Sequence, residues 1–314
     1  MNLLKPKFWD YKKPNSLSYI LIPISKIIEK ILKLKKKNKK KFNTIKTICV
    51  GNFYIGGTGK TSISIEIKKL LDNSNLKSCF IKKKYLDQLD EQKLLENFGK
   101  VYIETSRSTA LKNAIKDGFD VAIFDDGLQD YEISYDLSFV CFNKKSGLGN
   151  KCVIPAGPLR ESLDNLNEYN YVFLTGNDEN VLNLKNSLKE KNHKLIFFEA
   201  TYLPTNLKSL NLKKNYLAFS GIGNHSTFLE MLHKNNFKIS SDIQFPDHYN
   251  YKQKDIDKLW LIAQKTNSCL LTTEKDFIRL SDKVKKNIQF IKIQLKINRT
   301  EKLKELLSLL NEKN

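Results

Sequence analysis

A chain of 314 residues, 40% of them hydrophobic and 11% aromatic, is long enough for one large α/β domain or two ordinary ones. Its formal net charge of +20 comes almost entirely from lysine, whereas nucleic-acid surfaces depend on arginine for bidentate contacts. The composition therefore argues against a nucleic-acid binder. The scattered cysteines fit buried thiols in a reducing cytosol, and none of their spacings suggests zinc.

The first patterned segment, Ser16 to Lys41, is an apolar helix that ends in a run of lysines. It is too short and too charged to span a bilayer, and it lacks the cleavage site of a signal peptide. Residues 1–41 are therefore predicted to form an amphipathic basic helix region. Two alternatives stay open: the helix lies in a membrane interface over anionic headgroups, or it docks on its own domain. Its apolar residues at helical spacing are Leu17, Ile20, Leu21, Ile24, Ile27, Ile28, Ile31, Leu32 and Leu34.

The segment from Ile45 to Thr61 predicts a buried strand, a phosphate-binding loop and the first turn of a helix. Glycines let backbone N–H groups point at phosphate oxygens, and Lys60 adds a full positive charge. Thr61 is placed to ligate Mg²⁺ through its hydroxyl. The usual G-x-x-x-x-G-K-[ST] spacing would have glycine where Tyr54 stands. The expected nucleotide-binding residues are Gly56, Gly57, Thr58, Gly59, Lys60 and Thr61.

Strands and helices alternate after this loop, which predicts a parallel sheet with helices on both faces. One buried strand, residues 119–124, leads directly into Asp125 and Asp126. Because ligands of such sheets bind at the carboxyl ends of the strands, these carboxylates are expected partners of Mg²⁺. A stiff loop rich in proline and glycine then presents Arg160 and Glu161, which can hold a phosphate and a metal.

A polar, lysine-rich stretch at residues 204–214 is a candidate linker to a second α/β lobe. The predicted lobe has strands at 216–219, 269–271 and 288–293, with helices at 226–233 and 300–310. The sequence therefore predicts a P-loop kinase core at 42–205 and a smaller C-terminal lobe at 206–314. His248, next to Asp247, could be oriented by a carboxylate, but taken alone it is more typical of a structural loop histidine.

Together these segments resemble the tetraacyldisaccharide 4'-kinases, the lipid A 4'-kinase family of Gram-negative bacteria. The motifs occur in the family's order and cover most of the chain. They are Pro6 to Trp9, Val50-Gly51-Asn52, Gly56 to Thr61, Asp125-Asp126-Gly127-Leu128-Gln129, Pro155 to Glu161, Phe219 to Gly223, Phe245 to His248, and Thr273-Glu274-Lys275-Asp276. The family's own phosphate loop also lacks the first glycine.

The resemblance implies transfer of the ATP γ-phosphate to the 4'-hydroxyl of a tetraacylated glucosamine disaccharide 1-phosphate, with Mg²⁺. It implies a peripheral or monotopic protein at the cytoplasmic face of the inner membrane, without nucleic acid or an obligate protein partner. The residues it implies are Lys60, Asp90 and His248 for catalysis, Asn52 and Arg160 for substrate, and Thr61, Asp126, Gln129 and Glu161 for Mg²⁺. Asp90 would accept the proton of the hydroxyl, with His248 steadying it.

Several positions depart from the family pattern. Lys82 and its neighbours stand where the family has Ser-Arg-Gly-Tyr-Gly, Asp130 replaces a histidine, and Tyr135 stands where arginine is usual. These departures leave open a family member with reduced activity. The alternative from another class is a P-loop switch ATPase that acts through protein partners. A GTPase is disfavoured because Asn143-Lys144-Lys145-Ser146 lacks the aspartate that guanine specificity usually needs.

Overall fold

The computed structural model describes residues 5–35, 39–85, 89–177 and 181–311. The chain divides into two compact units. Of the described residues, the large unit comprises 5–35, 39–85, 95–177, 181–200 and 297–311, and the small unit comprises 89–94 and 201–296. This division differs from the three regions that the sequence predicts, which are 1–41, 42–205 and 206–314. Residues 89–94 group with the small unit, whereas the C-terminal helix and the N-terminal helix both group with the large one.

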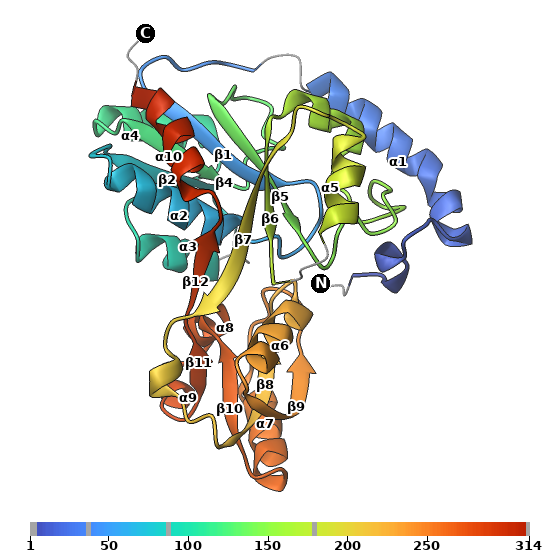
Figure 1. Cartoon of the computed structure of the whole chain (residues 1–314), viewed down its shortest axis with the longest axis vertical. Helices are drawn as coiled ribbons and strands as arrows, with labels where there is room; N and C mark the ends of the chain where they lie inside the picture. Colours follow the sequence, from blue (N-terminus) through green and yellow to red (C-terminus); the bar gives the residue numbers. More distant parts are fainter. Residues whose placement is uncertain (1–4, 36–38, 86–88, 178–180, 312–314) are drawn as a thin grey trace. The chain divides into compact units, whose positions relative to one another are not determined.

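The large unit is built on a mostly parallel sheet with the strand order β12-β7-β6-β5-β1-β4-β2-β3. β1 lies between β5 and β4, so the strand order reverses on either side of it, and its carboxyl end is where ligands of such sheets bind. Figure 1 shows this sheet with its helices. The strands are β1 (Lys46–Asn52), β2 (Ser78–Lys83), β3 (Val101–Glu104), β4 (Val121–Asp125), β5 (Leu137–Asn143), β6 (Tyr171–Thr175), β7 (Ile196–Pro204) and β12 (Ile293–Ile297).

Both faces of this sheet are buried, as expected for parallel strands covered by helices. Along β5, Val140 packs into the main core cluster, while Phe139 on the opposite face packs against the rings of Phe173, at a tilt, and Phe198, edge to face. The expected α/β class with a P-loop-like parallel sheet is thus confirmed. The helices of the large unit are α1 (Ser16–Lys35), α2 (Lys60–Asp72), α4 (Arg107–Lys116), α5 (Leu182–Lys189) and α10 (Thr300–Ser308), with short 3-10 helices at Lys7–Asp10, Leu163–Glu168 and Leu309–Asn311.

The small unit contains a second parallel sheet of order β11-β10-β8-β9. Alternate residues of β8 face opposite cores: Tyr216 packs with α6, and Leu217 packs with α7. This period of two is what a strand between two helical layers requires. The elements are β8 (Asn215–Ser220), α6 (His225–Lys234), β9 (Lys238–Gln244), α7 (Gln253–Lys265), β10 (Ser268–Thr273), α8 (Glu274–Arg279), α9 (Asp282–Lys285) and β11 (Gln289–Ile291), with a 3-10 helix at Leu207–Ser209. α3 (Leu89–Glu96) has most of its residues in this unit.

The prediction of one strand at residues 288–293 is wrong, because this segment holds the ends of two strands. β11 belongs to the small sheet, whereas β12 begins at Ile293 and joins the edge of the large one. Four elements of the small unit were not predicted: β9, α7, α8 and α9. β9 is an edge strand of half-buried and exposed residues without an apolar pattern. α7 does carry a helical signal, since Ile256, Leu259 and Ala263 form its buried face.

Candidate active site

The expected phosphate loop connects β1 to α2 in the large unit. Gly59 precedes α2 with a φ of 80°, and Gly56 has a φ of 115°, backbone conformations that favour glycine. The loop is braced from within by Asn52, which is fully buried and donates from its amide to Thr58 Oγ1 at 2.9 Å and to the carbonyl of Tyr54. The sequence predicts a substrate contact for Asn52. In the structure its side-chain amide donates to the loop, and its backbone carbonyl accepts from the Gln129 amide at 3.1 Å.

Asp125, at the carboxyl end of β4, is fully buried beside the first turn of α2. Its carboxylate accepts hydrogen bonds from Thr61 Oγ1 at 3.2 Å and Ser64 Oγ at 3.5 Å. It also forms an ion pair of 2.7 Å with Lys82, whose side chain is 1% exposed. Lys82 and Thr61 therefore share the Asp125 carboxylate, and the charge of Lys82 balances that of Asp125. Sequence reasoning treated Lys82 only as a departure from the family, because nothing local indicates that a lysine in an apolar strand points at β4.

Asp126 lies between two cations. Its Oδ1 accepts from Arg160 Nη1 at 2.7 Å, and its Oδ2 is 3.6 Å from Lys60 Nζ. Burial acts to raise the pKa of Asp126, but the nearby charges of Lys60, Arg160 and Lys82 outweigh it and hold this pKa well below its usual range. Two ion pairs thus link Lys60 of the phosphate loop, Asp126 after β4 and Arg160 of the proline-rich loop into one row of charges, which we call the charged chain.

The backbone at Asp126 is in the left-handed region, with a φ of 61°. Such a conformation is uncommon for residues other than glycine and needs support from its surroundings. Arg107 supplies it by donating to the Asp126 carbonyl at 2.6 Å while pairing with Asp130 at 3.1 Å. Tyr135 adds a hydrogen bond of 3.0 Å to the Gly127 carbonyl. Two departures from the family, Asp130 and Tyr135, therefore brace the loop that carries Asp126.

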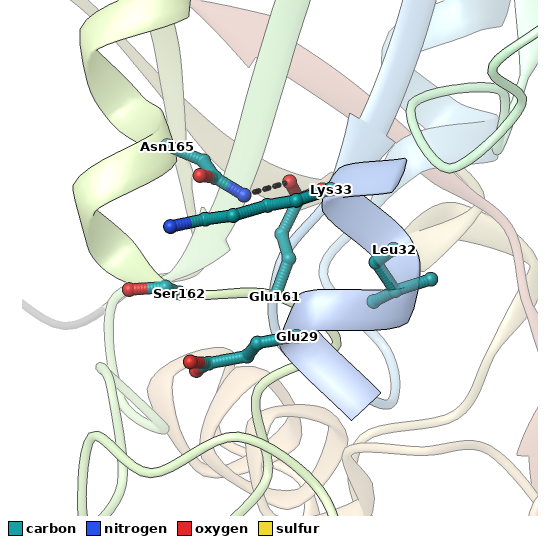
Figure 2. A pocket seen from close by; sticks show the side chains of 6 residues that line it. All are labelled: Glu29, Leu32, Lys33, Glu161, Ser162 and Asn165. Carbon is teal, nitrogen blue, oxygen red and sulfur yellow. Dashed lines mark hydrogen bonds between the residues drawn. The ribbon is translucent and has the colours of Figure 1, made fainter. Parts of the chain in front are cut away.

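Gln129 and Glu161 also lie together in the large unit. The amide of Gln129 donates to Glu161 Oε1 at 2.8 Å, and its oxygen accepts from Arg160 at 3.2 Å. Glu161 is 1% exposed, and its second oxygen accepts from Asn165 at 2.8 Å. Figure 2 shows Glu161 and Asn165, joined by their hydrogen bond, in a small pocket that they line together with Ser162 and with Glu29, Leu32 and Lys33 of α1. The N-terminal helix therefore borders the glutamate expected to hold the metal.

The donor set fits Mg²⁺. Thr61, Asp126 and Glu161 offer only oxygen, which is the donor that Mg²⁺ prefers. Within the described residues, no three Asp, Glu, His or Cys side chains form a group that could hold an ion unaided. In kinase sites one or two carboxylates normally share Mg²⁺ with the phosphates of the nucleotide.

In the small unit, Asp90 on α3 and His248 in the loop after β9 are in direct contact. His248 Nδ1 lies 3.1 Å from Asp90 Oδ1, and Arg279 Nη2 donates to Asp90 Oδ2 at 2.6 Å. The carboxylate is 2% exposed and the imidazole 20% exposed. Although they are 158 positions apart in the chain, Asp90 and His248, two of the three expected catalytic residues, form a hydrogen-bonded pair.

Charges around this pair set its protonation. Burial acts to raise the pKa of Asp90, but the hydrogen bond from His248 and the charges of Arg279 and Lys275 lower it to about 2. Burial acts to lower the pKa of His248, whereas Asp90, Asp247 and Glu91 raise it above its usual value. Asp90 is therefore an ionised carboxylate at neutral pH, and the imidazole beside it is biased toward its protonated form.

Comparisons with known proteins identify the same family across the whole chain. A family model for tetraacyldisaccharide-1-P 4'-kinase matches residues 17–311. A tetraacyldisaccharide 4'-kinase from Pelagibacter ubique is 50% identical over 314 residues, the full length of both chains. One from Rickettsia conorii is 33% identical, covering 97% of this chain and 98% of the relative. A crystal structure of LpxK from Aquifex aeolicus in complex with ATP has a TM-score of 0.70 at 24% identity, covering 94% of this chain and 99% of that one, which supports the fold.

Proposed function

We propose that this chain, which belongs to the tetraacyldisaccharide-1-P 4'-kinase family, transfers the γ-phosphate of ATP to the 4'-hydroxyl of a tetraacyldisaccharide 1-phosphate. The observation that carries the proposal is the charged chain from Lys60 through Asp126 to Arg160 at the carboxyl end of the sheet. Two cations and a half-buried carboxylate beside a glycine-rich turn are what a triphosphate and its metal would need, and this supports the proposal.

We propose a role in phosphoryl transfer for each of these charged side chains and for the residues beside them. We assign to Lys60 and the loop amides the binding of phosphate oxygens, and to Arg160 the binding of substrate phosphate or of charge that develops during transfer. Thr61, Asp126, Gln129 and Glu161 would hold Mg²⁺, which would supply positive charge that neutralises the transferred phosphate. Asp125 and Lys82 would keep the Thr61 hydroxyl in place from below.

The acceptor hydroxyl must lose its proton as the new P–O bond forms. We assign that proton to Asp90, which is ionised at neutral pH and is held by His248 and Arg279. The imidazole, whose pKa is raised, stabilises the carboxylate by a charge-assisted hydrogen bond. This assignment gives the small unit the acid–base step and the large unit the nucleotide.

Replacing Asp90 by asparagine should lower kcat about a hundredfold, since the amide keeps the shape but accepts no proton. The KM for ATP should stay within about twofold, because no nucleotide contact is assigned to this residue. The measurement is steady-state transfer to the lipid acceptor, with the exposed Asp257→Asn on α7 as the matched control. Asp90→Asn with normal kcat would show that another group takes the proton.

The N-terminal helix supports a membrane-surface location. Its apolar side chains Ile20, Ile24, Ile27, Ile31 and Leu34 are all exposed, and their spacing of three and four residues makes one stripe. Its buried positions are instead serines: Ser25 donates to the Val153 carbonyl at 2.7 Å, and Ser18 accepts from Asn150 at 3.0 Å. None of the helices in the described part of the chain is both long and apolar enough to cross a bilayer.

We therefore propose that α1 lies along the inner-membrane surface, on its cytoplasmic face, with the apolar stripe in the lipid and the nearby lysines over anionic headgroups. Of the lysine run, Lys39, Lys40 and Lys41 are described, whereas Lys36 and Lys37 lie outside the described residues. This orientation would bring an anionic lipid acceptor to the protein that phosphorylates it. The serine contacts hold the helix against the loop that leads to Arg160 and Glu161.

Substituting Ile24 and Ile27 together by serine should weaken binding to vesicles with anionic lipid at least about tenfold, since each isoleucine loses its burial in lipid. Sedimentation with such vesicles measures this, and Leu182→Ser, which removes an exposed leucine of α5, is the control. These substitutions leave the serine contacts intact, unlike a deletion of the whole segment. Unchanged sedimentation of the double variant would mean that the stripe does not enter the membrane.

The proposed reaction is tested by incubating the purified protein with γ-labelled ATP and tetraacyldisaccharide 1-phosphate in mixed micelles. We expect label in the lipid, and ATP consumption that depends on the lipid. A switch ATPase would hydrolyse ATP without regard to the lipid and would respond to a protein partner instead. Label at a low rate would identify a family member of reduced activity, and no label in the lipid would contradict the proposal.

A further inference from the structure

Arg279, the last residue of α8, contacts three parts of the small unit at once. Its Nη2 donates to Asp90 Oδ2 at 2.6 Å, and its Nη1 donates to the Gly221 carbonyl at 2.6 Å and to Asp276 Oδ1 at 3.0 Å. The side chain is 10% exposed. Its Nε is buried with no hydrogen-bond partner among the described residues, so the guanidinium is not placed to satisfy all of its own donors.

The Gly221 carbonyl links Arg279 to His248 as well. It accepts the backbone N–H of His248 at 3.0 Å in addition to the bond from Arg279. His248 has a φ of 56°, a left-handed conformation that a histidine keeps only where its surroundings enforce it. One planar guanidinium therefore holds both the carboxylate of Asp90 and the carbonyl that anchors the backbone of His248.

The guanidinium is itself fixed from behind by Asp276, which is fully buried. The carboxylate of Asp276 accepts from the Gly221 N–H at 2.9 Å, from Tyr251 Oη at 2.8 Å and from Thr273 Oγ1 at 2.6 Å. Neutral donors from three different segments thus orient this carboxylate toward Arg279. The arrangement leaves the guanidinium little freedom to move away from Asp90.

We propose that Arg279 is a positioning residue for phosphate transfer, and that it sets the distance and angle between Asp90 and His248. The inference rests on the proposed function, in which Asp90 accepts the proton of the acceptor hydroxyl. Arginine suits this task because its nitrogens lie in one rigid plane and can bind an oxygen on each side. Lysine at the same position would be a single point donor and could not hold Asp90 and Gly221 in fixed relation.

A purely structural ion pair would contact the same residues, so the test must separate the two roles. We expect Arg279→Met to lower kcat about tenfold to a hundredfold, because misplacement of a reacting group by about 1 Å has effects of this size. Arg279→Lys should fold normally and recover only part of the loss. The KM for ATP should not change in either variant, and Lys258→Met, at an exposed lysine of α7, is the matched control.

The decisive measurement combines Arg279→Met with Asp90→Asn. If Arg279 acts through Asp90, the double variant should be no more than about twofold slower than Asp90→Asn alone. Losses that multiply, or a kcat that falls only in step with the folded fraction in thermal melts, would overturn the inference. The proposed function fails separately: in that case Asp90→Asn alone keeps its activity, whatever Arg279→Met does.

The imidazole of His248 gives a readout besides activity. Charged groups that face the pair are Arg279 and Lys275 from α8, Glu91 from α3 and Asp247 from its own loop, with Asp276 behind Arg279. Removing the positive charge at Arg279 should raise the pKa of His248, whereas Asp90→Asn should lower it. Nuclear magnetic resonance titration of the ring protons measures both shifts. An unchanged His248 pKa in Arg279→Met would show that the guanidinium does not hold the pair.

Discussion

Replacing Lys60 by alanine is expected to lower the rate of phosphate transfer about ten-thousandfold, the largest effect of any single substitution in this chain. Lys60 Nζ lies 3.6 Å from Asp126 and belongs to the first turn of α2, where backbone N–H groups already favour an anion. The alanine substitution removes the positively charged side chain of the phosphate loop, so that only backbone N–H groups are left there to bind phosphate oxygens. Transfer of labelled γ-phosphate to the lipid acceptor measures the loss.

Lys69→Ala provides the control, because Lys69 lies near the other end of α2 and pairs with Glu66 at 2.7 Å, away from the loop. It should keep normal kcat and KM. The Lys60 variant should melt close to the temperature of the unchanged protein, since Asp126 keeps its bond of 2.7 Å to Arg160. A Lys60→Ala protein that still transfers phosphate at a near-normal rate would mean that the nucleotide binds elsewhere.

Much of the large unit follows from local pattern. The apolar run before Gly56, the Gly-Lys-Thr turn and the carboxylates after residues 119–124 predict a strand, a helix start and a strand end, and parallel pairing then brings Asp125 and Asp126 to the loop. Periodicity is sufficient here because each element is buried on a defined face. The helix at 16–35 follows from the same 3.6-residue period, whereas the exposure of its isoleucines and the burial of Ser18 and Ser25 were not predicted.

What could not be predicted depends on contacts between distant residues. Lys82 looks like one of many lysines until β2 pairs with β4 and places it 2.7 Å from Asp125. Likewise, Arg279 gains its role only because α8 meets α3, an approach that no spacing in the sequence encodes. Residues 89–94 joined the small unit for the same reason. The pairing of Asp90 with His248 came from the resemblance to the family, and the residues alone favoured a structural role for His248.

Asp126→Ala should reduce transfer about a thousandfold and raise the Mg²⁺ concentration needed for half-maximal rate. Its pKa is held far below neutral by Lys60, Arg160 and Lys82, so the carboxylate is ionised at every assay pH and the loss should be the same from pH 6 to pH 9. Lys60, Arg160 and Mg²⁺ would all bind the same phosphate. Without the negative charge of Asp126 between them, the two cationic side chains would repel the metal.

Alanine also removes a side chain from a residue with a φ of 61°, and that backbone change could itself disturb the loop. Asp126→Asn separates the two effects, because asparagine tolerates the left-handed conformation but carries no charge. We expect Asp126→Asn to lose nearly as much activity as alanine while melting normally. Asp120→Asn, at the opposite end of β4 and exposed, should change nothing. If Asp126→Asn transfers phosphate normally at low Mg²⁺, then the charge after β4 is not what binds the metal, and Glu161 with Gln129 must hold it instead.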